Sequence, residues 1–453
     1  MIDFCSVLLL ERHDIASHSQ PQSRWVCTTC TGSEQTMKTR NHIFISLVLG
    51  LLFSVIAVAC GSSDPPASTT DSAAAPPTAG IVAEPSQAPD SSESAQPTST
   101  SGPAPTPTAG PPLPTYPEGV LEVYGIDAWL NSEPFTIAEK LAQNKVVLVD
   151  FWTYTCVNCL RTLPFLREWH AKYADRGLVI LGVHTPEFEF EKDYDNVKAA
   201  TVREGIEWPV ALDNDYETWD SFRNRFWPAK YLIGVDGQLT YRHFGEGAYV
   251  EVEQAIRDTL AAAGYDVSDI PIGSIDSADR DPLANQVTRE LYGGYERNYT
   301  TQGIYAGQEQ YYIKPDSTRE YVDTGAYTPQ QFYLQGLWTN GPESIIHARE
   351  TKNLEDHLAF EFVGRSANVV IDPAGPEPFD VYVELDDRPL KPEEAGIDIL
   401  FDDQGRSYFT VEEAKLYAFL EVPEFGKYIV KLSSNSDNFA IFAFTFGIND
   451  GGI

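Results

Sequence analysis

The chain has 453 residues, which is too long for one ordinary domain, and its hydrophobic content of 42% is enough to fill two or three cores. The formal net charge of −34 argues against a nucleic-acid partner, because an acidic surface repels phosphate groups. Six cysteines are too few for a disulfide scaffold of this length. Their positions along the chain therefore matter more than their number.

The N-terminal part of the chain predicts export. Residues 1–36 do not look like a signal region, and we interpret them as an over-extended start or a cytoplasmic segment. Residues 37–60 form a basic start and an apolar run that ends on small residues before Cys60, as in a signal peptide. The segment also resembles a bacterial lipobox, which implies a lipid on Cys60 and attachment to a membrane. An uncleaved anchor helix is the alternative, and either places the remainder outside the cytoplasm.

The predicted signal is followed by a linker and two folded regions. Residues 61–117 are mostly Ser, Thr, Pro, Ala and Gly, so we expect a disordered linker. We predict a first domain over residues 118–265, a connector over 266–290 and a second domain over 291–449. Cys27 and Cys30 form a C-x-x-C pair, but the signal separates it from the later pair. We therefore predict no metal site.

The first domain contains the other two cysteines. The unbroken apolar run 146–152 predicts a buried parallel strand, and Cys156-Val157-Asn158-Cys159 follows it directly. Apolar residues then recur at helical spacing, which places Cys156 at the start of a helix. Free backbone N–H groups and the helix dipole stabilise a thiolate there. A C-x-x-C in this context indicates redox chemistry, although a structural disulfide is the simpler alternative.

The rest of this domain alternates between predicted strands and helices. We expect strands over 178–183 and 210–212, and a hairpin of strands around Asp236-Gly237. Helices are predicted over residues 191–203, 216–226 and 250–263. This pattern predicts an α/β fold with a mixed sheet.

These motifs resemble the thioredoxin superfamily. Asp150-Phe151-Trp152 precedes Cys156 at the spacing thioredoxins use, Pro164 matches the proline in their active-site helix, and Pro228 precedes a strand as their cis-proline does. The insertion around 187–204 is similar to exported reductases of the TlpA/ResA type. The run up to Trp227-Pro228-Ala229 looks closest to the C-terminal region of DipZ-like proteins.

The resemblance implies a role for each matching residue. Cys156 would attack a client disulfide, Cys159 would resolve the mixed disulfide, Asp150 would accept the proton of Cys159, and Pro228 would present its backbone to the client. Two alternatives without a catalytic role stay open: Asp150 could be a hydrated carboxylate at the end of a strand, and Pro228 could be an ordinary trans proline. The chain departs from the family at Thr155, where Trp is usual.

A second departure from the family is Thr162, which stands where many exported reductases keep a buried Glu. His184 is tempting as a proton shuttle, but we interpret it as a structural residue. Val157-Asn158, between the cysteines, supplies no cation to stabilise a thiolate, which favours a reductant.

Short alternating apolar runs from about residue 332 onward predict an all-β sandwich or jelly roll. DipZ-like proteins are similar in placing a β-sandwich that resembles a carbohydrate-binding module after the redox domain. Six tyrosines precede the runs; they are suited to stacking on a glycan, and core packing explains them equally well. The six are Tyr292, Tyr295, Tyr299, Tyr305, Tyr311 and Tyr312.

The leading interpretation is a membrane-tethered thiol–disulfide oxidoreductase that reduces client proteins, for example in cytochrome c maturation or disulfide repair. The sequence carries no flavin or nicotinamide motif, so we expect no cofactor and electrons from a membrane donor. One alternative is a thiol peroxidase, because Thr153-Tyr154-Thr155-Cys156 echoes the T-x-x-C of peroxiredoxins. Another is a glycan- or protein-binding lipoprotein with an idle redox domain.

Overall fold

The computed structural model describes residues 121–273, 283–298 and 303–448. The predicted signal segment, Cys60 and the linker over 61–117 lie outside these residues, as do Tyr299 and part of the predicted connector. Within the described parts of the chain, no helix is both long enough and apolar enough to cross a bilayer.

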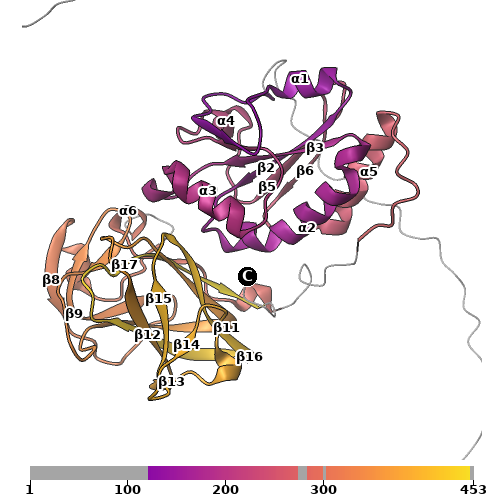
Figure 1. Cartoon of the computed structure of the whole chain (residues 1–453). Coiled ribbons are helices and arrows are strands. Elements are labelled where there is room, and N and C mark those ends of the chain that lie inside the picture. Colours follow the sequence, from indigo (N-terminus) through magenta and orange to yellow (C-terminus); the bar gives the residue numbers. More distant parts are fainter. Residues whose placement is uncertain (1–120, 274–282, 299–302, 449–453) are drawn as a thin grey trace, which may run out of the picture. The chain divides into compact units, whose positions relative to one another are not determined.

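The redox domain is a six-stranded sheet with helices on both faces (Figure 1). The strand order is β1-β4-β3-β2-β5-β6; the β2–β3 and β3–β4 pairs are parallel, and the other neighbours are antiparallel. Its elements are β1 (Ala128–Leu130), α1 (Ile137–Ala142), β2 (Val146–Trp152), α2 (Val157–Tyr173), η1 (Ala174–Arg176), β3 (Leu178–His184), η2 (Glu189–Lys192), α3 (Tyr194–Arg203), β4 (Val210–Leu212), α4 (Glu217–Ser221), β5 (Ala229–Ile233), β6 (Leu239–Phe244) and α5 (Tyr249–Ala262). The predicted thioredoxin-like α/β fold is confirmed.

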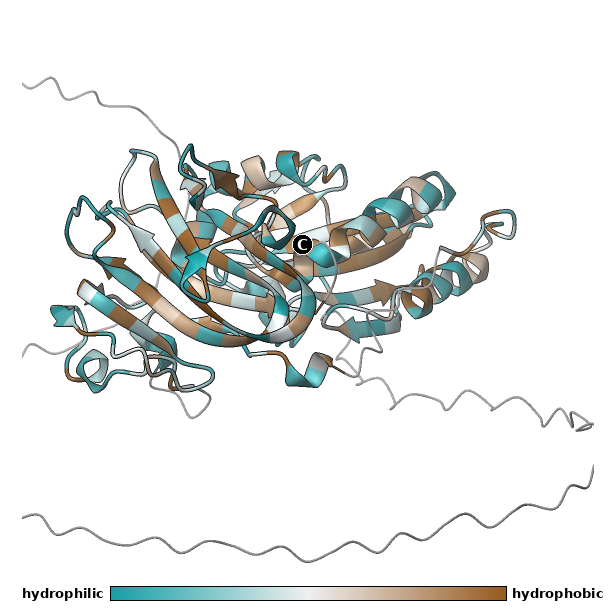
Figure 2. Ribbon diagram, turned by 90° about the horizontal axis from the view of Figure 1, so that it is seen from below, coloured by the Kyte–Doolittle hydropathy of each residue, from teal (hydrophilic) through white to brown (hydrophobic). Residues whose placement is uncertain are grey.

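Strand β2 lies in the middle of this sheet, and all seven of its residues are buried. Helices α2, α3 and α5 pack on one face, while α1 and α4 cover the other. The inner strands β2 and β3 are accordingly apolar along most of their length, whereas the edge strand β6 is not (Figure 2). A central strand covered on both faces explains why the run over 146–152 is not alternating. It also means that any polar group on β2 is removed from water.

Two predicted helices differ from those observed. The helix expected over 216–226 ends at Ser221, because Arg223 adopts a left-handed φ of 52° that a helix cannot continue through. The helix expected from 191 is split into η2 and α3 at Asp193, whose side chain caps α3 by accepting from the backbone N–H groups of residues 195 and 196. In both cases local side-chain or backbone chemistry overrides the apolar periodicity.

The C-terminal domain is rich in strands, as predicted. Its elements are η4 (Ala284–Gln286), β7 (Leu291–Tyr292), α6 (Tyr295–Asn298), η5 (Glu309–Tyr312), β8 (Ser317–Tyr321), β9 (Phe332–Asn340), β10 (Ile345–His347), β11 (His357–Ile371), β12 (Phe379–Leu385), β13 (Arg388–Pro389), η6 (Pro392–Glu394), β14 (Leu400–Phe401), β15 (Ser407–Val411), β16 (Lys415–Ser434) and β17 (Ala440–Gly447).

Hydrogen bonds join these strands into one continuous eleven-stranded sheet. The long strand β11 makes this possible, because residues 357–360 pair with β9 whereas residues 366–371 pair with β17. Its pairing with β16 shifts register at two places along its length. Such shifts bend long strands, so a single sheet can enclose one apolar core that draws on strands from β7 to β17.

The tyrosines that precede these strands serve partly as packing residues. Tyr311 is fully buried and its hydroxyl donates to the carbonyl oxygen of Gly293 at 2.6 Å. Tyr305 is 7% exposed and belongs to the same core. Core packing therefore accounts for these two residues without a ligand.

Candidate active site

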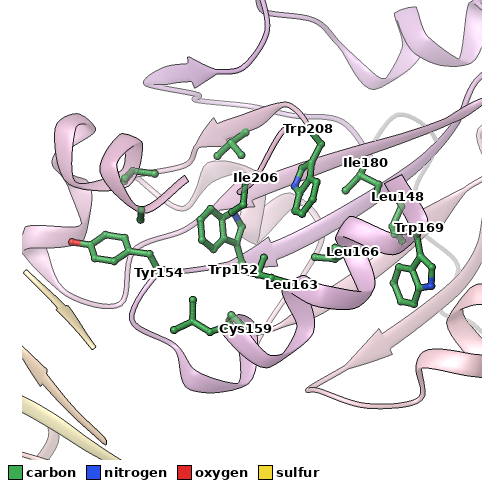
Figure 3. Close-up of a cluster of buried hydrophobic side chains, with 14 of the residues drawn as sticks. Leu148, Trp152, Tyr154, Cys159, Leu163, Leu166, Trp169, Ile180, Ile206 and Trp208 are labelled. Atoms are coloured by element: carbon green, nitrogen blue, oxygen red, sulfur yellow. The ribbon is translucent and has the colours of Figure 1, made fainter. Parts of the chain in front are cut away.

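The two cysteines of the redox domain lie at the junction of β2 and α2. Cys156 is the N-cap residue of α2, and its Sγ accepts a hydrogen bond from the backbone N–H of Cys159 at 3.2 Å. Cys156 is partly exposed, whereas Cys159 is 1% exposed in the first turn of the helix, among apolar side chains (Figure 3). The N-terminal N–H groups and the helix dipole stabilise a thiolate at the accessible position.

The two thiols differ in their electrostatic surroundings as well as in exposure. Both are free rather than joined in a disulfide. Burial raises the pKa of Cys159 well above its usual value, and its hydrogen bond with Cys156 and the charge of that residue raise it further. Cys159 therefore needs a base before it can act as a nucleophile.

A buried ion pair supplies a candidate for that base. Asp150 of β2 is 2% exposed and Lys230 of β5 is fully buried; Lys230 Nζ lies 3.6 Å from Asp150 Oδ1. The two residues face each other because β2 and β5 are antiparallel neighbours in which Asp150 pairs with Lys230. Among the residues that the structure describes, neither Asp150 Oδ1 nor Lys230 Nζ has a hydrogen-bond partner. Burial raises the pKa of Asp150 to about 6, although the charge of Lys230 opposes this rise.

Asp150 is thus a carboxyl group that can take up and release a proton near neutral pH. Its charge is one of the influences that raise the pKa of Cys159, which ties the two groups electrostatically. Lys230 was not singled out from the sequence. A lysine in the second position of an otherwise apolar strand was the available signal, but only the register of the sheet places it opposite Asp150.

Pro228 directly precedes β5, and the peptide bond between Trp227 and Pro228 is cis. Its carbonyl oxygen accepts from the backbone N–H of Gly245, so the segment is fixed at the end of β6. Trp227 is held as well, because its indole N–H donates to the carbonyl oxygen of Thr185 at 3.1 Å.

The residues between β2 and Cys156 form a buried polar network. Thr155 Oγ1 donates to Glu191 Oε1 at 2.5 Å, and Thr153 Oγ1 contacts His184 Nε2 at 3.3 Å. Tyr154 stacks on the His184 ring. Burial lowers the pKa of His184 to about 3, so it stays neutral, which agrees with the structural interpretation of this residue.

Glu191 is the second residue that sequence reasoning missed. The sequence predicts a helix that starts at Glu191 and assigns no role to this residue, yet it is fully buried beside the cysteine loop. By contrast, Thr162 is buried but is not itself ionisable. Its hydroxyl donates to the carbonyl oxygen of Asn158 at 2.9 Å and contacts Tyr249 Oη at 3.3 Å.

Comparison with known proteins agrees with this geometry. Residues 109–256 match the family described as Redoxin, and residues 288–447 match the family described as Thioredoxin like C-terminal domain. Protein DipZ of Mycobacterium tuberculosis (strain CDC 1551 / Oshkosh) is 38% identical over 222 residues, which are 48% of this chain and 30% of that protein. Thiol-disulfide oxidoreductase YkuV of Bacillus subtilis (strain 168) is 31% identical over 140 residues, 31% of this chain and 93% of that protein.

Among solved structures, one titled "Solution Structure of a Thioredoxin-like Protein in the Oxidized Form" is 31% identical, with a TM-score of 0.29. The match covers 32% of this chain and 95% of that one. The chain spans less than a third of the DipZ relative, so the activity of that whole protein does not transfer to it.

Proposed function

Because the chain belongs to the thioredoxin-like thiol–disulfide oxidoreductases, we propose that it reduces disulfides of client proteins outside the cytoplasm by dithiol exchange. The observation that carries this proposal is the pairing of an accessible cysteine at a helix N-terminus with a buried cysteine one turn later. That asymmetry suits one sulfur to attack and the other to resolve.

The proposed reaction has two steps. The Cys156 thiolate attacks one sulfur of a client disulfide, which breaks the client S–S bond, forms a mixed disulfide and releases the other client sulfur as a thiolate. Asp150 then accepts the proton of Cys159, and the Cys159 thiolate attacks Cys156 Sγ. This forms the Cys156–Cys159 disulfide and releases the second client thiol. Two electrons have passed from the pair to the client.

In this proposal Lys230 stabilises the ionised form of Asp150, so the base is ready near neutral pH. Pro228, next to the redox pair in thioredoxin folds, would present the backbone of its segment to an extended client; proline itself has no N–H group to donate, and its carbonyl oxygen already accepts from Gly245. No group in this cycle replaces the two electrons, so a thiol-transferring membrane donor is proposed to reduce the pair again. Cytochrome c maturation and disulfide repair are the client pathways we consider.

We also propose that the protein is held at the bacterial cell membrane as a lipoprotein through Cys60. The support is the apolar run that ends on small residues before Cys60. Replacing Cys60 with serine should release the protein from the membrane fraction of cells; retention of the variant there would contradict lipid anchoring.

The reduction potential of the Cys156–Cys159 pair tests the proposed function. We expect about −250 mV or lower, the thioredoxin range, from equilibration with glutathione or dithiothreitol buffers. The Cys156→Ser variant is the control and should show no reversible couple. A potential near about −120 mV would instead indicate a disulfide-forming oxidase, and the absence of any couple in the unaltered chain would end the redox proposal.

A further inference from the structure

Glu191 is a buried carboxyl group beside the redox pair that the reaction above does not use. It lies in η2, the short helix between β3 and α3, and it is fully buried. Oε1 accepts from Thr155 Oγ1 at 2.5 Å, and Oε2 accepts from the backbone N–H groups of Glu187 and Phe188 at 2.5 and 3.1 Å. The carboxylate therefore ties η2 to the residue immediately before Cys156.

The surroundings of Glu191 hold donors but no countercharge. In the described parts of the chain, no basic side chain lies within ion-pair distance of it, unlike Asp150 with Lys230. The titratable groups that face it are Glu187 from the same loop, Tyr154 from the cysteine loop and Tyr216 from before α4. Arg297 of α6 pairs with Glu187 at 2.6 Å rather than with Glu191.

This environment makes the charge on Glu191 costly. Burial and, after it, the charge of Glu187 raise the pKa of Glu191 to about 7, against the lowering effect of the hydrogen bonds from the two threonines and the loop backbone. A proton that enters or leaves this site near neutral pH must rearrange its hydrogen bonds. When Oε1 carries a proton, it can no longer accept from Thr155; the bond between them reverses, so that Oε1–H donates to Thr155 Oγ1 and the threonine hydroxyl has to turn away.

We propose that Glu191 is a positioning residue of the redox site, which holds the loop before Cys156 through Thr155 and makes the reactivity of Cys156 depend on whether Glu191 is ionised. This inference rests on the proposed function and deepens it. Ionised Glu191 fixes the loop and also places a negative charge near the attacking thiol, which opposes thiolate formation. Neutral Glu191 removes that charge.

The test is the rate at which iodoacetamide alkylates Cys156 in the reduced full-length chain between pH 5 and 9, followed by mass spectrometry of the peptide that carries this residue. Cys159 lies on the same peptide, so fragment-ion sequencing is used to localise the label to Cys156. We expect the rate profile of the unaltered chain to show a step near pH 7 besides the ionisation of the thiol itself. Glu191→Gln should abolish that step and raise the rate at pH 8 about threefold or more.

Two further variants keep the result interpretable. Thr155→Val removes one donor to the ionised carboxylate, so the step should remain but move to higher pH. Glu253→Gln alters a comparably buried carboxylate, 2% exposed, which accepts from Tyr173 Oη at 2.7 Å and not from the cysteine loop. This control should leave the profile unchanged.

The outcomes separate the inference from the function on which it rests. A step that persists in Glu191→Gln, or that Thr155→Val does not move, would overturn the role of Glu191 while leaving a reactive Cys156. Because Asp150 also titrates near pH 6, the assignment depends on the response to substitution and not on the pH of the step alone. If Cys156 reacted no faster than a free cysteine in solution at any pH, the proposed function itself would fail.

Discussion

The redox domain and the C-terminal domain both bury carboxyl groups, but they surround them differently. In the redox domain, burial raises the pKa of Asp150 and Asp213 to about 6 and that of Glu191 to about 7. In the C-terminal domain, hydrogen bonds from Arg388 lower the pKa of Glu394 to about 2.

Asp356 of the C-terminal domain illustrates the second arrangement. Its burial alone would raise its pKa, but hydrogen bonds from Arg349 and His347 and from the backbone of Leu337 hold it below the usual range. The buried carboxylate of Asp356 thus has hydrogen-bond donors that compensate its charge. The redox domain instead leaves charges poorly compensated next to its cysteines, where a proton has to move.

The contrast has exceptions on both sides. Glu253 of the redox domain has a lowered pKa because Tyr173, Gly273 and Lys172 oppose the effect of its burial. Asp372 of the C-terminal domain has its pKa raised to about 6, chiefly by burial. The contrast therefore does not hold for every carboxyl group of either domain. In the redox domain, the carboxyl groups with a raised pKa include the two near the cysteine segment, Asp150 and Glu191.

The largest expected effect is on the folding of the C-terminal domain. Asp356→Ala removes the acceptor shared by His347 Nε2 at 3.0 Å and Arg349 Nε at 2.7 Å. Breaking a buried pair in this way should lower the free energy of unfolding by about 3 kcal/mol or more, measured by denaturant titration. The reduction potential of the cysteine pair should not change, because the hydrogen-bond partners of Asp356 are His347, Arg349 and Leu337 of its own domain; a shift in that potential would contradict this prediction.

The next largest effect concerns Glu191 and pH. Its pKa is higher in the folded chain, at about 7, than the ordinary 4.5, so the folded state holds this proton more tightly. The resulting stabilisation is complete below about pH 4.5 and is lost as the pH rises through 7. The side chain at position 191 of Glu191→Gln cannot ionise, so this one contribution is missing from the variant, whereas the contributions of Asp150 and Asp213 are common to both proteins.

The unaltered chain should therefore lose about 1 to 3 kcal/mol of unfolding free energy relative to Glu191→Gln between pH 4.5 and 8. Denaturant unfolding of both proteins at several pH values measures this difference. An unchanged difference across the range would mean that Glu191 is not held in a costly ionised state.

The smallest of the three effects sharpens the role of the buried lysine. Lys230→Met removes the cation that opposes the rise in the pKa of Asp150, so that pKa should move above 6 and leave less carboxylate at pH 6 to 7. Resolution by Cys159 should slow about tenfold there and recover at higher pH.

Release of thionitrobenzoate from Cys156 reports this step, in a chain whose other cysteines except Cys159 are serine. Lys172→Met is the matched control, because Lys172 pairs with Glu253 at 2.9 Å in the same domain and should leave the rate unchanged. Equal rates for Lys230→Met and the unaltered chain at pH 6 to 7 would remove Lys230 from the proton path.

The sequence by itself determined those features of this protein that depend on contiguous residues. The buried strand over 146–152, the C-x-x-C after it and the apolar helix beyond are contiguous, so the position of Cys156 at a helix N-terminus follows from periodicity alone. The α/β fold with a mixed sheet and the strand-rich second domain could be predicted for the same reason, since each rests on repeated short patterns. The thioredoxin-like identity of the first domain came from the resemblance of Asp150-Phe151-Trp152, Pro164 and Pro228 to that family. The helix expected over 216–226 was wrong at its end because one residue adopts a left-handed conformation.

Only the tertiary structure decided which side chains meet at the site. Lys230 stands 80 positions after Asp150, and the two come together because β2 and β5 pair in one particular register. Glu191 lies 36 positions after Thr155, in an insertion whose predicted helix gave no sign that this side chain is buried beside the cysteines. Charges become costly or useful through the groups packed around them, and packing between distant segments is not written in the spacing of residues along the chain.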